Sequence, residues 1–286
     1  MAFNAEGFYQ ELDRLYGAHD SEGARRLMLE TREAVRGDKL AETAVLNELA
    51  CFYRNTSAWT PCVESFRELL SVMESAGTEN TEDYARAVLN MAGAYRLMGD
   101  YDSALATFAR ARDILDKQNA EPYSYASIWN NEGLVYQDMG DFSKAAEYFE
   151  RGLNILRTIP ERSSEYAVNL SNLAAAYFRG GKQDAAIRAL DEALSLFSGM
   201  EGVGAMHYAS ALNTKAVMLF SSGNLRESAA LFTQAAEQTK LVFGENKDYA
   251  SACRSCAAVY ARLGDAENAA LWREKYERAA EDLKNR

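Results

Sequence analysis

The chain has 286 residues, of which 48% are hydrophobic and 26% are charged, and it contains only three prolines. This composition is typical of a globular protein and excludes a disordered or fibrous one. The net charge is −11. A field of this sign repels phosphate backbones and anionic lipids, so nucleic acid and membrane surfaces are not expected partners.

The N-terminal segment MAFNAEGFYQ has no basic region ahead of an apolar run, so we expect no signal peptide. No stretch approaches the roughly 20 apolar residues that a membrane-spanning helix needs. Four cysteines in a chain of this length do not form a disulfide framework. These features together predict a soluble protein of a reducing compartment, the cytoplasm.

The first part of the chain predicts helices with a weak repeat pattern. Two apolar helical stretches within residues 5–36 indicate a degenerate N-terminal repeat or cap, which we assign to residues 1–41. The next unit, framed on Glu42, carries Ser57 where the later units have glycine, and Pro61 in the first turn of its second helix, where proline is tolerated. Its apolar positions are Leu46, Leu49, Ala50, Tyr53, Trp59, Cys62 and Phe66.

From residue 84 onward the chain repeats itself. Five Tyr-Ala dipeptides stand 41, 41, 42 and 41 residues apart, and a glycine follows each tyrosine fifteen residues later. A fixed period of this length indicates an array of repeats, in which each unit buries its apolar face against its neighbours. The tyrosines are Tyr84, Tyr125, Tyr166, Tyr208 and Tyr249, and the glycines are Gly99, Gly140, Gly181, Gly223 and Gly264.

Each repeat predicts two antiparallel helices joined by a tight turn. In the repeat from Tyr84, apolar residues from Val88 to Tyr95 form one helical stripe, which Gly99 ends because glycine readily takes positive φ. Asp100 suits the N-cap of a second helix, from Tyr101. The fold class is therefore all-α, with repeats starting near residues 42, 84, 125, 166, 208 and 249. The array covers residues 42–286, and its highly charged last helix caps it.

The repeated pattern resembles the tetratricopeptide repeat, and the best match is WNNEGLVYQDMGDFSKAAEYFERGL at residues 129–153. The usual period is about 34 residues, and the longer period here resembles that of kinesin light chain repeats. This resemblance implies a right-handed α-α superhelix of about six to seven helix-turn-helix repeats. It also implies a non-catalytic scaffold that binds a peptide or protein segment in its concave groove. Glu132 and Lys215 replace the leucine of the pattern, and we expect packed stems and solvated charged heads.

In this family the first helix of each repeat lines the concave groove, and asparagine recurs on that face. Asparagine is a poor helix former, so its repetition suggests another use. Carboxamides donate and accept together, and a ladder of them can hold the backbone of an extended peptide. The alternative is that these side chains bond to neighbouring helices and stabilise the stack. The residues are Asn47, Asn90, Asn130, Asn131, Asn172 and Asn213.

Arginines gather on the same face, where Glu48 and Asp138 are the few acids. They suggest that the ligand is an acidic peptide or a free C-terminal carboxylate, although ordinary ion pairs with adjacent helices are the alternative. Phe178 and Phe220 are expected to be exposed in the groove and to grip an apolar anchor, unless the superhelix closes over them. The arginines are Arg54, Arg86, Arg96, Arg179, Arg254 and Arg262.

The sequence offers little for catalysis. The two histidines, His19 near the N-terminus and His207 in an expected loop, lack metal-ligand spacing. Cys253 and Cys256 fall at core positions, which favours packing over redox or zinc chemistry; Cys51 and Cys62 are likewise expected to be small buried residues. Phosphate-loop and nucleophile-elbow motifs are missing. We therefore expect no enzyme, no cofactor and no metal.

Two other functions remain open from the sequence. One is a regulatory protein whose repeats sense a small peptide and whose N-terminal residues or convex face act on an effector. The other is a self-associating assembly protein, in which the charged C-terminal helix docks on another copy.

Overall fold

A computed structural model of the chain describes residues 3–284, apart from the side chain of Val203. Across these residues the regular structure is fourteen α-helices and one short 3-10 turn, with no strand, which confirms the all-α class. None of the helices in this range is long and apolar enough to cross a membrane. The chain divides into two compact units, residues 1–135 and 136–286, with the boundary inside one helix.

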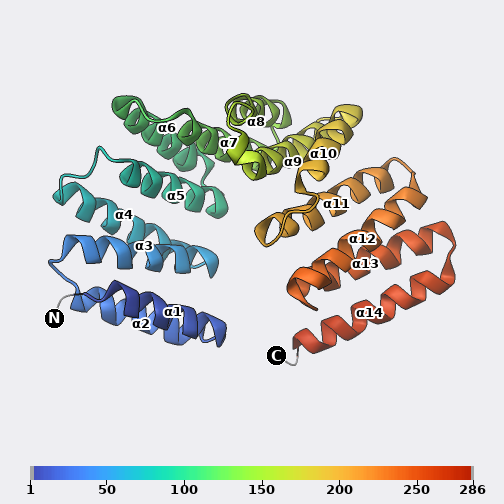
Figure 1. Cartoon of the computed structure of the whole chain (residues 1–286), viewed down its shortest axis with the longest axis horizontal. Coiled ribbons are helices and arrows are strands. Elements are labelled where there is room, and N and C mark those ends of the chain that lie inside the picture. Colours follow the sequence, from blue (N-terminus) through green and yellow to red (C-terminus); the bar gives the residue numbers. More distant parts are fainter. Residues whose placement is uncertain (1–2, 285–286) are drawn as a thin grey trace. The chain divides into compact units, whose positions relative to one another are not determined.

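In the first unit, consecutive helices pair and the pairs stack in chain order (Figure 1). Phe66 and Phe108, from the second helices of two successive pairs, are both fully buried in one continuous core. The expected helical stretches near the N-terminus are present as a pair that packs on the next repeat. The helices are α1 (Ala5–Gly17), α2 (Ser21–Ala34), α3 (Lys39–Asn55), α4 (Trp59–Ser75), α5 (Glu82–Met98), α6 (Tyr101–Gln118) and α7 (Pro122–Asp138), whose last turn belongs to the second unit.

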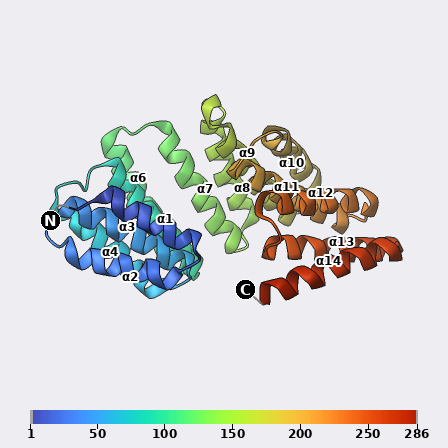
Figure 2. The same cartoon turned by 60° about the horizontal axis from the view of Figure 1, so that its bottom comes forward.

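The second unit continues the same scheme, and the views in Figures 1 and 2 agree that α11 and α12 lie beside α13 and α14. The charged last helix buries only Ala269, Trp272 and Ala279. The elements are α8 (Phe142–Leu156), the 3-10 turn η1 (Pro160–Arg162), α9 (Ser163–Arg179), α10 (Gln183–Phe197), α11 (Val203–Ser221), α12 (Leu225–Phe243), α13 (Lys247–Leu263) and α14 (Ala266–Lys284).

The turn inside each repeat forms where the glycine predicts it. All five repeated glycines have positive φ, as at Gly140, where φ is 83°. Ser57, which replaces the glycine in the earlier repeat, takes the same left-handed conformation with φ of 56°, and this conformation is strained for a residue with a side chain. In the three repeats where aspartate follows the glycine, it caps the second helix, as Asp100 does by accepting from the Ser103 amide at 3.2 Å.

The repeated tyrosines join helices through their hydroxyl groups. Tyr125 donates to Asp116 at 2.7 Å, and Tyr166 donates to Glu192 at 3.0 Å. Tyr84 binds Glu74 and Arg110. Burial, followed by the Glu74 hydrogen bond, raises the pKa of Tyr84 to about 12. In these three repeats the tyrosine is therefore a polar link between its first helix and a neighbouring second helix, and Tyr84 is also a core residue.

Two charged residues at core positions differ from expectation. Glu132 is only 2% exposed, and its carboxylate binds the guanidinium of Arg112 from the preceding helix, so the expected solvated head is wrong. A carboxylate this buried needs a charged partner because it has lost its water. Lys215 has a packed stem as expected, but its ammonium lies 2.6 Å from Asp191.

His207 lies within α11 and not in a loop, because that helix begins at Val203, five residues ahead of Tyr208. Its ring stacks on Phe197, with centroids 5.7 Å apart. Burial lowers the pKa of His207. The stretch Ser198–Gly202 that forms the connection is shorter than the sequence suggested, since both of its glycines, Gly199 and Gly202, have positive φ and turn the chain sharply.

Candidate functional site

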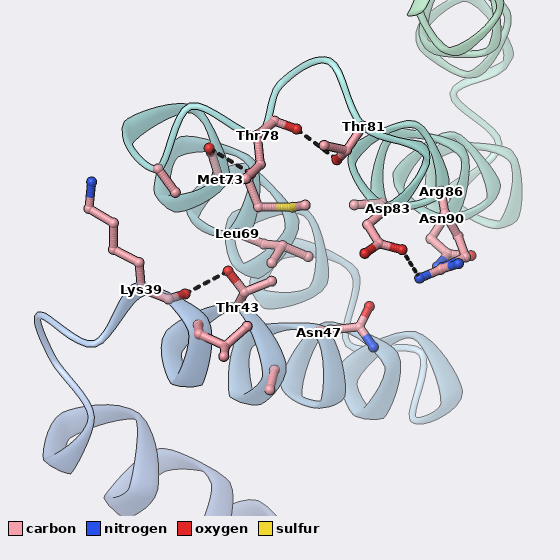
Figure 3. A pocket seen from close by; sticks show the side chains of 14 residues that line it. Lys39, Thr43, Asn47, Leu69, Met73, Thr78, Thr81, Asp83, Arg86 and Asn90 are labelled. Atoms are coloured by element: carbon pink, nitrogen blue, oxygen red, sulfur yellow. Dashed lines mark hydrogen bonds and ion pairs between the residues drawn. The ribbon is translucent and has the colours of Figure 1, made fainter. Parts of the chain in front are cut away.

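A pocket of about 510 Å³ lies in the first unit, between the first helices of two successive repeats. Figure 3 shows Leu69 and Met73 of α4 lying between α3 and α5, with Asn47 on one side and Asn90 on the other. Leu40, at the start of α3, also lines it and is 83% exposed. We call this the N-terminal pocket. It has an apolar floor and polar walls, which is the usual arrangement of a ligand site.

The polar walls of the N-terminal pocket present mostly acceptors. Thr43, Thr78 and Thr81 each donate their hydroxyl hydrogen to a backbone carbonyl, at 2.8, 2.9 and 2.8 Å. Thr81 also accepts from the Tyr84 amide at 3.2 Å, so it keeps one lone pair available, whereas Thr43 and Thr78 keep two. Asn47 hydrogen-bonds to the carboxylate of Glu48. Burial raises the pKa of Glu48, and the bond from Asn47 opposes that shift. A ligand with amide N–H groups suits such walls.

The second unit contains a pocket at the equivalent positions of its own repeats, of about 370 Å³. It lies between α11 and α13 above the end of α12, and we call it the C-terminal pocket. The residues that line the two pockets occupy the same positions of the repeat. Positions are counted from Glu42 and Tyr208 in the first repeat at each pocket, and from Tyr84 and Tyr249 in the second. Leu40 matches Met206, Ala44 Ser210, Asn47 Asn213, Leu69 Ala235, Met73 Thr239, Asp83 Asp248, Arg86 Ser251 and Ala87 Ala252.

A third pocket, of about 450 Å³, lies where the C-terminal parts of α9 and α11 meet the end of α7. Its lining includes Phe178 and Arg179. The Arg179 guanidinium is exposed and lies over the Phe142 ring, 5.0 Å from the centroid. Gln137 supplies a buried Oε1 that has no hydrogen-bond partner. This pocket could accept a negatively charged group beside an apolar one.

The six predicted asparagines are all half-buried on first helices. Asn47 and Asn90 meet in the N-terminal pocket, and Asn213 lines the C-terminal one. Asn131 donates one amide hydrogen to the carbonyl of Ser127 in its own helix at 2.9 Å, so that hydrogen is not available to a ligand. Asn130 and Asn172 line none of the three pockets described above, although both have interaction partners.

The predicted arginines are more scattered. Arg86 pairs with Asp83 in its own helix, and Arg262 lies 4.8 Å above the ring of Phe220. Phe178 and Phe220 are half-buried, so the expectation that both are exposed is wrong: Phe178 lines a pocket, and Phe220 packs on a core cluster beneath Arg262. Arg54 and Arg96 are half-buried, and Arg179 and Arg254 are exposed.

The sequence pattern did not identify the second-helix floor, Leu69 and Met73, because the family resemblance places the groove on first helices. It also missed Asn169, which is 1% exposed and whose amide nitrogen and oxygen both lack a partner in the described structure. Isoleucine at the equivalent Ile128 is fully buried, so the sequence did contain a signal: a polar residue at a position that is apolar in the other repeats.

The cysteines are free thiols, and Cys62, Cys253 and Cys256 are buried as expected, while Cys51 is half-buried. Burial raises the pKa of Cys256 to about 12 and that of Cys62 to about 11. Thiols held in the protonated form are poor nucleophiles and metal ligands. Within residues 3–284 no group of three or more histidine, cysteine or acidic side chains is placed to hold a metal ion.

Two models of the tetratricopeptide repeat match the sequence, over residues 87–121 and 124–198. Both segments coincide with the helix pairs and glycine turns described above. Residues 87–121 and 124–198 are therefore tetratricopeptide repeats. A comparison with curated proteins finds no match. Tetratricopeptide repeats generally form non-catalytic scaffolds for protein interaction.

Solved structures of other tetratricopeptide-like proteins share the fold. BtubC (BKLC) from P. vanneervenii is 19% identical with a TM-score of 0.66, over 80% of this chain and 91% of that one. A Podosopora anserina putative kinesin light chain with TPR-like repeats is 18% identical with a TM-score of 0.59, over 72% and 99%. A Rap protein complexed with Competence and Sporulation Factor is 17% identical with a TM-score of 0.65, over 97% and 75%. At these identities the likeness concerns the fold alone.

Proposed function

We propose that this tetratricopeptide-repeat protein is a scaffold whose first-helix pockets bind an extended peptide or protein segment. The observation that carries the proposal is the recurrence of one pocket at equivalent positions in both units, with Asn47 in one and Asn213 in the other.

The N-terminal pocket suits a peptide in two ways. Its apolar lining, which joins the buried floor of Leu69 and Met73 to the exposed Leu40, offers apolar surface to one side chain. Its walls offer Asn47, Asn90 and three threonine oxygens to the peptide backbone, which has one N–H donor and one C=O acceptor per residue.

The test begins with selection of binders from a displayed library of random peptides of about a dozen residues. Asn47→Ala and Asn90→Ala should each weaken binding of the selected peptides by about 1 kcal/mol, which is about fivefold, by removing a hydrogen bond. Asn154→Ala, on the exposed side of α8, is the matched control and should leave affinity unchanged. If Asn47→Ala and Asn90→Ala lower the melting temperature and leave affinity intact, the asparagines stabilise the stack and the proposal fails.

A sensor of a small peptide is the second candidate, favoured by one observation. The Rap protein whose structure holds Competence and Sporulation Factor aligns with 97% of this chain. In a sensor, the selected peptide would change the hydrodynamic radius of the protein as it binds. An unchanged radius in dynamic light scattering at saturating peptide would leave the scaffold as the better description.

A further inference from the structure

The two equivalent pockets differ in one charge. In the N-terminal pocket, Asp83 forms an ion pair with Arg86, one turn further along α5. The same aspartate recurs as Asp248 at the start of α13, but Ser251 occupies the place of Arg86. The Asp248 carboxylate makes no hydrogen bond or ion pair with any residue of the described structure. Both aspartates lie in the first turn of a helix, so the helix dipole acts equally on each and does not explain the difference.

No nearby cation replaces the missing arginine. Lys240 is paired with Glu245 at 2.6 Å, and the exposed Lys247 is not among the residues that line the pocket. His207 does line it, but burial lowers its pKa, so the imidazole is neutral at pH 7. The C-terminal pocket therefore carries one uncompensated negative charge.

The rest of the pocket suits a planar cation. Phe243 and Met206 on the lining are 39% and 38% exposed, and an aromatic face attracts a guanidinium. The Thr239 hydroxyl donates to the Ala235 carbonyl at 2.8 Å and keeps its lone pairs, and the Ser210 and Asn213 side chains can also accept. Several acceptors around one carboxylate match the five donors of arginine better than the point charge of lysine.

We propose that the C-terminal pocket binds the side chain of an arginine, with its guanidinium on Asp248 and its stem along Phe243. The inference rests on the proposed function in one respect, that the arginine belongs to the bound peptide. It assigns the two pockets different specificities: an apolar side chain where Leu69 and Met73 form the floor, and a cationic one where the floor is Ala235 and Thr239.

The chain contains a direct reporter of this pocket, since His207 is one of only two histidines and its ring resonances can be followed by NMR. The probe is N-acetyl-arginine-N-methylamide, titrated at pH 7.5. Its neutral isostere, the corresponding citrulline compound, is the matched probe. The arginine compound should shift the His207 signals and leave those of His19 in place, with an affinity at least about tenfold above that of the citrulline compound.

Two variants complete the test. Asp248→Asn should weaken the arginine compound at least about tenfold, and Ser251→Arg should do the same by restoring the ion pair seen in the N-terminal pocket. Asp184→Asn, which removes an exposed first-turn carboxylate from α10, controls for the helix terminus and should change nothing. Raising the salt concentration should weaken the arginine compound and spare the citrulline one.

The inference is overturned if the two probes shift the His207 signals equally, or if these signals stay in place throughout the titration. It is also overturned if Asp248→Asn binds the arginine compound with full affinity. Its failure is distinguishable from failure of the proposed function. If library peptides bind through Asn47 and Asn90 while the arginine compound leaves His207 unmoved, only the arginine site is lost. If the arginine compound binds and no library peptide does, the pocket is real and the peptide scaffold is not.

Discussion

At the scale of single residues, Glu132 shows how a repeat tolerates a charge in its core. The side chain occupies a position where the repeat pattern prefers leucine, and it is 2% exposed. Arg112 reaches it from α6 while lying over the ring of Trp129, 4.9 Å from the centroid. The ion pair therefore replaces an apolar contact between the helices of neighbouring repeats, and the arginine stem and indole ring cover it.

Removing one partner of this pair should cost more than removing both. Glu132→Leu leaves the Arg112 guanidinium without its carboxylate, and we expect a loss of about 3 kcal/mol in the free energy of unfolding. The double variant Glu132→Leu/Arg112→Met should recover most of that loss, because an apolar pair of similar volume suits the site. Urea unfolding of the two single variants and the double variant measures the coupling. A double variant as unstable as the sum of the singles would mean that the pair is not coupled.

At the scale of the helix pair, the turn geometry decides which residue ends the first helix. Gly140 takes φ of 83° with no atom within 4 Å of an added Cβ, so any cost of substitution there comes from the backbone and not from a clash. Ser57 holds the same conformation with a side chain. Substitutions at these two positions test the turn in opposite ways, because one adds a side chain at positive φ and the other removes one.

Gly140→Val should destabilise the protein by about 1 kcal/mol or more, since a β-branched residue resists positive φ. Ser57→Gly should stabilise it by a few tenths of a kcal/mol to about 1 kcal/mol, because it relieves the strain, although glycine also gains entropy in the unfolded chain. Thermal melting followed by circular dichroism measures both. A neutral Gly140→Val variant would mean that the turn conformation contributes nothing to stability.

The helix pairs could be predicted from the sequence because their signals are local. The period, the glycine after each first helix and the aspartate cap all lie within one repeat, and Gly99 and Asp100 do what their chemistry predicts. What the sequence could not show are pairings between elements. Arg112 lies twenty residues before Glu132, and no local pattern joins them.

Of the N-terminal pocket, the sequence predicts only the residues that first helices contribute to the lining. The asparagine pattern predicts Asn47 and Asn90 on one face, and in the structure both line one pocket. Its floor comes from a second helix, and Arg86, which the sequence predicts to bind ligand, lines the pocket while it forms an ion pair with Asp83. Distinguishing these roles needs the distance between side chains, which a repeat pattern does not contain.

At the scale of the whole molecule, the cysteines should contribute to stability through packing alone. Buried thiols with raised pKa, such as Cys62 and Cys256, neither ligate metals nor exchange readily. We therefore expect that neither a zinc chelator nor a reductant changes the melting temperature. Differential scanning calorimetry with and without each reagent measures this. A drop of several degrees with the chelator would contradict the assignment of all four cysteines to packing.

The last helix, α14, buries few residues, and this affects the tryptophan fluorescence of the protein on heating. Of the three tryptophans, Trp272 lies in α14, is 4% exposed and packs into a core cluster of the second unit. The Lys275 ammonium lies 3.8 Å from its ring centroid. Trp59 and Trp129 lie in the first unit and are half-buried. In an array whose units hold only their neighbours, end repeats open most readily. On heating, the emission maximum of Trp272 should therefore shift to longer wavelength at a lower temperature than those of Trp59 and Trp129. A fluorescence melt would then record the release of α14 while far-ultraviolet ellipticity still reports a folded array.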